Sequence, residues 1–164
     1  MRFGLAALVL LVPTAAFAQA TRPQPHIKRT NPPTLATPAG YTQVVEVSGA
    51  VKTIYIAGQV STNKDGNVVG ANDMKAQAEQ VFKNLEAALT AAGARFSDVV
   101  KMNMYATDLA QIQAIRDARA TYVGDATPAS TLVQVVRLAR PEFMLEIEAI
   151  AAVPERPHLV PASR

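Results

Sequence analysis

The alternation of side chains near the C-terminus constrains the fold more than any other stretch. Apolar residues occupy every second position, with two carboxylates between them: Phe143, Leu145, Ile147, Ala149 and Ala151 against Met144, Glu146, Glu148 and Ile150. A period of two is typical of a β-strand with one buried face, so residues 143–151 are predicted to be a strand. Glu146 and Glu148 then share one face. Spacing alone leaves two interpretations open, a half-solvated strand with surface glutamates or a carboxylate site.

A second strand is predicted just upstream of this one. Pro128 holds the preceding residue extended, and residues 131–136 are rich in β-branched side chains. The segment therefore reads as a loop that enters a strand, with Ser130 at the junction.

Five further elements follow from hydrophobic period and turn chemistry. Strands are predicted at residues 41–47, 52–60 and 98–106, and helices at residues 74–92 and 109–122. Asn72 or Asp73 can cap the first helix, Gly93 can end it, and Asp108 can cap the second. The first two strands are expected to pair as an antiparallel hairpin through Ser48-Gly49-Ala50. The predicted order is β-β-α-β-α-β-β.

Two helices on one face of a mainly antiparallel sheet define an α+β fold. The opposite face is also expected to carry apolar groups, namely Met144, Ile150 and, depending on register, Val133 and Val135. An uncovered apolar sheet face requires a partner. We therefore expect oligomerisation through that face, with sites at subunit boundaries, although the pattern does not give the number of subunits.

The first residues predict a secretory signal peptide over 1–18. One positive charge, Arg2, precedes the apolar run 5–12, and small residues at Ala16 and Ala18 form an A-x-A site. Cleavage is expected after Ala18, which places the protein in the periplasm or outside the cell. The apolar run is shorter than the roughly 20 residues of a membrane anchor, so no stable membrane insertion is expected after cleavage.

The rest of the chain is predicted to be one domain between two tails. Residues 19–30 are predicted to be a flexible leader, because their proline density forbids a helix or a central strand. The proline-rich stretch continues to Pro38. Residues 31–154 form the predicted domain, and residues 155–164 a C-terminal tail.

Composition excludes several classes of function. The formal net charge of +3 is small and dispersed, which argues against a nucleic-acid partner. The chain has no cysteine, so disulfides, thiol catalysis and thiolate metal sites are excluded. Its two histidines, His26 and His158, lie in the proline-rich ends, outside every patterned element.

Several motifs in order carry a resemblance to a known family. The most specific are Pro128-Ala129-Ser130-Thr131-Leu132-Val133 and Leu145-Glu146-Ile147-Glu148-Ala149-Ile150-Ala151, and others lie at residues 31–33, 40–43, 56–60, 98–101 and 105–109. With them the chain resembles the RidA (YjgF-like) family of reactive-intermediate deaminases. The resemblance implies a chorismate-mutase-like α+β fold. It also implies a homotrimer whose sheets form a central barrel, with three ligand pockets between subunits.

The resemblance also implies an activity and a set of site residues. Active members hydrolyse enamines and imines to 2-keto acids and ammonia, without a metal or cofactor. Tyr41 matches the pocket tyrosine, Gly58 the glycine whose backbone lines the pocket, and Glu146 the pocket glutamate, a general acid or base. From the residues alone, Tyr41 can equally be a packing tyrosine and Glu146 a solvated strand residue. Gly58 can mark either a bulge or a close approach to the backbone.

Ser130 is the main departure from the family pattern. Deaminating members have an arginine after Pro-Ala, and a bidentate arginine–carboxylate contact contributes roughly 1.5–3 kcal/mol. Arg137 lies seven residues further along and is a poor substitute within one subunit. A neighbouring subunit could supply a different arginine, and pattern alone places neither Arg95, Lys101 nor Arg140.

Two functions therefore remain open. One is a deaminase with an altered substrate range, in which neutral Ser130 and Thr131 suit a hydroxyl- or amide-bearing ligand. The alternative is a non-catalytic small-molecule-binding trimer, favoured by Ser130 and by Leu132, which replaces the family's common cysteine. A ribonuclease finds no support in a weakly basic, exported chain.

Overall fold

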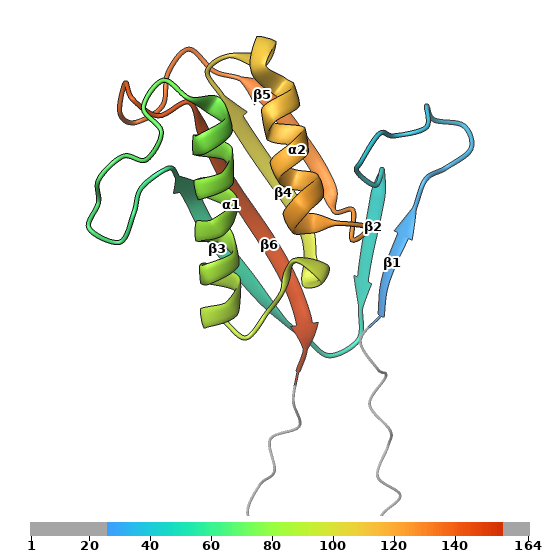
Figure 1. The fold of residues 1–164 in the computed structure, drawn as a ribbon. Coiled ribbons are helices and arrows are strands. Elements are labelled where there is room, and N and C mark those ends of the chain that lie inside the picture. The colour runs from blue at the N-terminus through green and yellow to red at the C-terminus, as the bar shows by residue number, and fades with distance from the viewer. Residues whose placement is uncertain (1–25, 156–164) are drawn as a thin grey trace, which may run out of the picture.

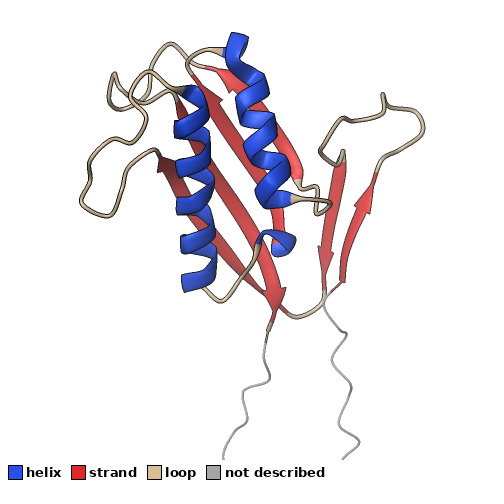
Figure 2. Cartoon of the chain, viewed as in Figure 1, coloured by secondary structure: helices blue, strands red, loops and turns tan. Residues whose placement is uncertain are grey.

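Two helices lie side by side on one face of a four-stranded sheet in the computed structural model, which describes residues 26–155 (Figures 1 and 2). The sheet has the strand order β3-β6-β4-β5. The elements are β3 (Val51–Val60), α1 (Met74–Ala91), β4 (Val99–Ala106), α2 (Ile112–Val123), β5 (Ala129–Gln134) and β6 (Leu145–Pro154). The predicted α+β class and the order of these six elements are confirmed.

β6 lies inside the sheet, antiparallel to both β3 and β4. β5 is parallel to β4, because α2 forms the crossover between them. The sheet is therefore mainly antiparallel, with one parallel edge strand.

The core lies between the helices and the sheet. The predicted apolar stripe of α1 is buried, and its largest member, Phe82, stacks on Tyr122 of α2 with ring centroids 5.7 Å apart. From the sheet, Met102, Leu145 and Ile147 fill the space beneath the helices. Burial of such side chains supplies most of the driving force for the fold.

Side-chain caps begin both helical segments. Asp73 Oδ1 accepts a hydrogen bond from the backbone N–H of Ala76 at 3.1 Å, so Asp73 is the cap of α1. Asp108 Oδ1 accepts from the N–H of Ala110 at 2.9 Å, as predicted, but the first turn is a 3-10 helix, η2 (Leu109–Gln111), that leads into α2.

The predicted hairpin of the first two strands is wrong. β2 (Val44–Ser48) pairs with β1 (His26–Thr30), not with β3. An ion pair of 3.0 Å between Lys28 Nζ and Glu46 spans this two-stranded sheet. β3 pairs instead with β6 along its length. The alternation in a strand fixes which side chains share a face, but it does not select the partner strand.

The predicted flexible leader also requires correction at its end. Residues 26–30 form strand β1, which stands beside the main sheet on the α2 side (Figure 1). Arg29 Nη2 donates to the carbonyls of Ser97 at 3.2 Å and Val99 at 3.3 Å, and so fixes β1 to the start of β4. The predicted signal peptide and most of the C-terminal tail lie outside the described residues. Within 26–155, no helix is long and apolar enough to cross a membrane.

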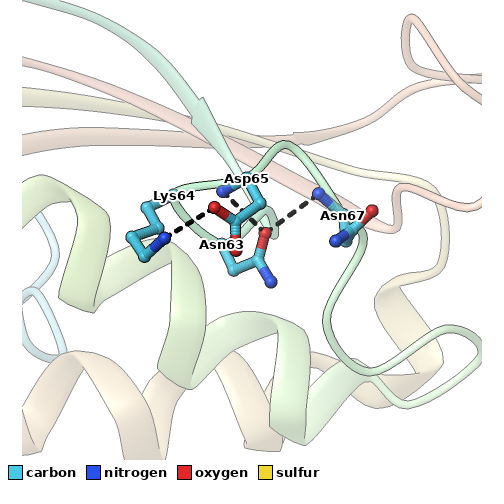
Figure 3. Close-up of polar contacts among 4 residues, drawn as sticks. All are labelled: Asn63, Lys64, Asp65 and Asn67. Carbon is cyan, nitrogen blue, oxygen red and sulfur yellow. Dashed lines mark hydrogen bonds and ion pairs between the residues drawn. The ribbon is translucent and has the colours of Figure 1, made fainter.

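The loop between β3 and α1 is held by its own polar groups (Figure 3). Asn63 Oδ1 accepts from the backbone N–H groups of Asp65 and Asn67, each at 3.0 Å. Lys64 Nζ pairs with Asp65 Oδ1 at 2.6 Å, and Gly66 adopts the left-handed backbone that a tight turn requires. Asp65-Gly66, a pair typical of tight turns, lies within this turn.

A fully buried glutamine, Gln77 of α1, fixes the entrance to β6. Its Nε2 donates to the carbonyls of Glu142 at 2.7 Å and Gly70 at 3.1 Å, and its Oε1 accepts from the N–H of Met144 at 2.8 Å. The amide thus replaces water for three backbone groups. It also fixes the backbone just before β6, which begins at Leu145, the residue before Glu146.

Replacing Gln77 with methionine should destabilise the fold markedly. Methionine has a similar length but leaves the Met144 N–H and the Glu142 carbonyl without partners, which should lower the free energy of unfolding by about 2–4 kcal/mol. Urea denaturation at one fixed protein concentration measures the change. The control is Gln113→Met on the exposed face of α2, expected to stay within about 0.5 kcal/mol of the wild type. Equal losses in the two variants would contradict this role for Gln77.

Candidate functional site

The five predicted site residues lie on both sides of the main sheet. Neighbours in a strand point to opposite faces. Ser130 is in register with buried Met102 and so faces the helices, whereas Thr131 is in register with Asn103 on the open face. There the Thr131 hydroxyl accepts a hydrogen bond of 2.8 Å from Lys101 Nζ. Within one subunit the predicted set is therefore divided.

Gly58 and Glu146 meet on the open face. The register between β3 and β6 shifts between Ile56 and Gln59, which places a bulge at Gly58. A Cβ atom added to Gly58 would lie 2.8 Å from Cδ of Glu146, and closer still to its carboxylate. Both interpretations of Gly58 are therefore correct, because the bulge brings its backbone directly under the glutamate.

The two carboxylates of β6 share a face, as predicted, but their surroundings differ. Glu148 Oε1 accepts hydrogen bonds from Asn103 Nδ2 at 2.8 Å and from the Tyr105 hydroxyl at 3.3 Å. The half-buried Glu146 carboxylate accepts none from any residue between 26 and 155. Glu146 is thus the carboxylate that remains available to a ligand or a water molecule.

Tyr105 of β4 connects these two acidic groups. Partial desolvation, followed by the negative charge and hydrogen bond of Glu148 and then the charge of Glu146, raises the pKa of its hydroxyl. Tyr105 consequently stays protonated over the whole physiological range and donates to Glu148. Tyr105 was not predicted from the sequence, although its place opposite Glu146 follows once β4 and β6 are paired.

Tyr41 is positioned on the other side by its neighbour Thr42. Thr42 is buried, and its N–H donates to the carbonyl of Pro128 at 3.1 Å. Its hydroxyl donates to the carbonyl of Thr127 at 2.8 Å. These bonds fasten the segment before β2 to the start of β5, so that Tyr41 and Ser130 line the same cavity.

This cavity has a volume of about 450 Å³ and combines apolar and polar walls. Its apolar side chains come mainly from α2 and the adjacent strands: Met104, Leu109, Ile112, Ile115 and Leu132. Its polar side includes Tyr41, Ser130 and two arginines of α2, Arg116 and Arg119.

Neither arginine of α2 was among the site residues predicted from the sequence. The spacing in the sequence could have indicated them. Arg116 lies four residues after Ile112 and Arg119 four residues after Ile115, so each arginine shares a helix face with an apolar residue of the cavity. The basic residues considered instead have other surroundings. Lys101 bonds to Thr131, and Arg140 pairs with Glu142 at 3.4 Å.

No group of three or more histidine, cysteine or acidic side chains is arranged to hold a metal ion in the described part of the chain. The side chains described above are carboxylates, hydroxyls and guanidinium groups. Glu146 can accept and return a proton, and the cavity beside Ser130 can hold a small molecule.

Comparisons with known proteins agree with this architecture. The family described as endoribonuclease L-PSP matches residues 32–153. A RutC family protein of Pyrococcus abyssi is 33% identical over 68% of this chain and 84% of its own length. A 2-iminobutanoate/2-iminopropanoate deaminase of Mus musculus is 35% identical over 68% of this chain and 79% of its own. The crystal structure of a Rid family protein of unknown function from Yersinia pestis superimposes with a TM-score of 0.70 and 38% identity, covering 77% of this chain and 98% of that one.

The contact between Gly58 and Glu146 predicts an energetic coupling. Gly58→Ala should lower the free energy of unfolding by about 1–3 kcal/mol, because the new methyl group collides with the carboxylate. In a Glu146→Ala background most of this loss should disappear, giving a coupling energy of roughly 0.5–3 kcal/mol in a double-mutant cycle measured by urea denaturation. Glu148→Ala is the matched control and should rescue nothing, since Glu148 bonds to Asn103 instead. Equal rescue by both backgrounds would refute the contact.

Proposed function

The chain belongs to the endoribonuclease L-PSP family, which includes the RidA (YjgF-like) proteins, and on that premise we propose that it is an exported, cofactor-independent deaminase of enamines and imines. The observation that carries the proposal is the Glu146 carboxylate, held over the Gly58 bulge without a hydrogen-bond donor from residues 26–155. A free carboxylate of this kind can serve as general acid and base. The name of the murine relative indicates the substrate class, 2-imino acids.

The proposed reaction needs only water and proton transfers. The imine reacts in its protonated form, and Glu146 accepts a proton from a water molecule as the water oxygen bonds to the imine carbon, which gives a neutral carbinolamine. Glu146 then gives this proton to the amine nitrogen, and the C–N bond breaks to release ammonia. As the carbonyl forms, the hydroxyl proton passes to Glu146 and from there to solvent. The products are a 2-keto acid and ammonia, with no change of redox state. An enamine enters the same route after protonation of its carbon.

Assembly through the open sheet face is part of the proposal. Tyr55, 76% exposed, lies in register with Ile150 on this face, and Val133 is 41% exposed. Of the other residues expected there, Met144 packs against the core instead. Exposed apolar side chains on a sheet face favour a partner. The division of the site residues within one subunit also supports a homotrimer with the reacting centre between subunits.

A specific observation favours the second candidate, a non-catalytic small-molecule-binding trimer. Ser130 replaces the arginine of the deaminating members and Leu132 the common cysteine, and both line the cavity beside Tyr41. A pocket of this size can bind a ligand without reacting with it. An endoribonuclease activity, as in the family's description, receives less support. The open face carries Glu146 and Glu148, whereas a phosphate backbone requires cations.

Deamination is tested with 2-iminobutanoate generated in situ by an amino-acid oxidase. We expect the wild type to release 2-oxobutanoate and ammonia faster than spontaneous hydrolysis does. Glu146→Gln should lower kcat by about 10²- to 10⁴-fold, because the amide cannot transfer a proton. Glu148→Gln keeps its contact with Asn103 and should change kcat by less than about tenfold. A wild type no faster than the uncatalysed reaction would exclude the deaminase and leave the binding protein.

Export and assembly are tested together by native mass spectrometry of protein recovered from the periplasm. The expected species is a trimer of chains that begin at Gln19. Tyr55→Glu should shift the population toward monomer, because it places a charge on the apolar face. Lys83→Glu, on the exposed side of α1, is the control and should leave the trimer intact. A chain that retains Met1, or a monomeric wild type, would contradict the respective part of the proposal.

A further inference from the structure

The cavity beside Ser130 contains a cationic group that the family resemblance does not account for. The guanidinium of Arg119 lies against Gly40, with Nη2 3.5 Å from the position a Cβ would take there. The two neighbours of Gly40, Ala39 and Tyr41, both line the cavity. The loop before β2 therefore packs on the head of Arg119 and holds it at the cavity wall.

Among residues 26–155, no carboxylate forms an ion pair with this group. Arg119 is half-buried, yet the ion pairs within the described residues join Lys28 to Glu46, Lys64 to Asp65 and Arg140 to Glu142. A partly desolvated charge without a partner is unfavourable. An anion entering the cavity would supply the missing counter-charge.

A second guanidinium, that of Arg116, increases the positive potential. Partial burial of Arg119, together with the like charge of Arg116 one helical turn away, lowers the pKa of Arg119, which nonetheless remains protonated at neutral pH. Both arginines line the cavity. Two guanidinium forks on one wall match the planar geometry of a carboxylate.

We propose that this cavity is a carboxylate site in which Arg119, supported by Arg116, anchors a small aliphatic acid beside Tyr41 and Ser130. The choice of 2-keto and 2-imino acids as ligands rests on the proposed function, whereas the anion site itself does not. The arginine missing after Pro-Ala in the sequence is replaced in space by an arginine from α2.

The lining indicates the class of ligand further. The volume of about 450 Å³ has room for a carboxylic acid and its chain but does not limit the chain length. Met104, Ile115 and Leu132 suit an aliphatic chain, and the Tyr41 and Ser130 hydroxyls suit a 2-keto oxygen or imine nitrogen. The short Ser130 leaves this volume open, whereas a long side chain at this position would extend into it.

The test is isothermal titration calorimetry with 2-oxobutanoate as the probe. Wild-type protein should bind it, and Arg119→Gln should weaken binding by about 10- to 100-fold, the loss expected for a bidentate charged contact. Arg137→Gln is the matched control, an exposed arginine beyond β5 that does not line the cavity, and it should bind as the wild type does. The neutral probe 2-butanone should bind wild type and Arg119→Gln equally weakly.

Arg119→Lys keeps the charge and most of the side-chain packing. It therefore serves as the control in case Arg119→Gln does not fold. It should retain more affinity than Arg119→Gln and less than the wild type, because lysine lacks the planar fork. If both Arg119 variants bind 2-oxobutanoate with wild-type affinity, the proposed carboxylate site is wrong, even if deamination is observed. Binding that depends on Arg119, in a protein without deaminase activity, would confirm the site and reject the proposed reaction.

Discussion

The packing of one face of β6 against the two helices is the constraint on which the rest of the structure depends. Leu145, Ile147 and Ala149 are buried there, so Glu146 and Glu148 must point to the opposite, open face. A slip of one residue would exchange the two sets and bury both carboxylates. Gln77 opposes such a slip, since its amide binds the backbone on both sides of Phe143.

The different surroundings of the two carboxylates arise from the strands on either side of β6. On one side, β4 supplies Asn103 and Tyr105, which occupy Glu148 with hydrogen bonds. On the other side, β3 supplies the backbone of its bulge, and the Glu146 carboxylate accepts no hydrogen bond from any of residues 26–155. The same spacing of two residues thus yields one structural and one available carboxylate, because the environment of each differs.

The cationic group of the cavity beside Ser130 comes from α2 and not from the strand that carries Ser130. Ser130 by itself indicated a pocket without a cation. Such a pocket suits a hydroxyl- or amide-bearing ligand better than a carboxylate. The Thr42 contacts with Thr127 and Pro128 draw the loop at Gly40 over α2, and this places Arg119 in the same cavity as Ser130. The charge of the pocket therefore depends on a helix about ten residues earlier in the chain rather than on the strand itself.

The sequence by itself determined the two helices, the four strands of the main sheet and the faces that these elements present. Asp73 and Asp108 cap as predicted, the stripe of α1 is buried, and Glu146 shares the open face with Glu148, because helix and strand periods are local properties of the chain. Only the tertiary structure decided that β2 pairs with β1, that Tyr105 holds Glu148, and that Arg119 lies beside Ser130. These are contacts between residues distant in sequence, and a local period carries no information about which distant segment will pack against it.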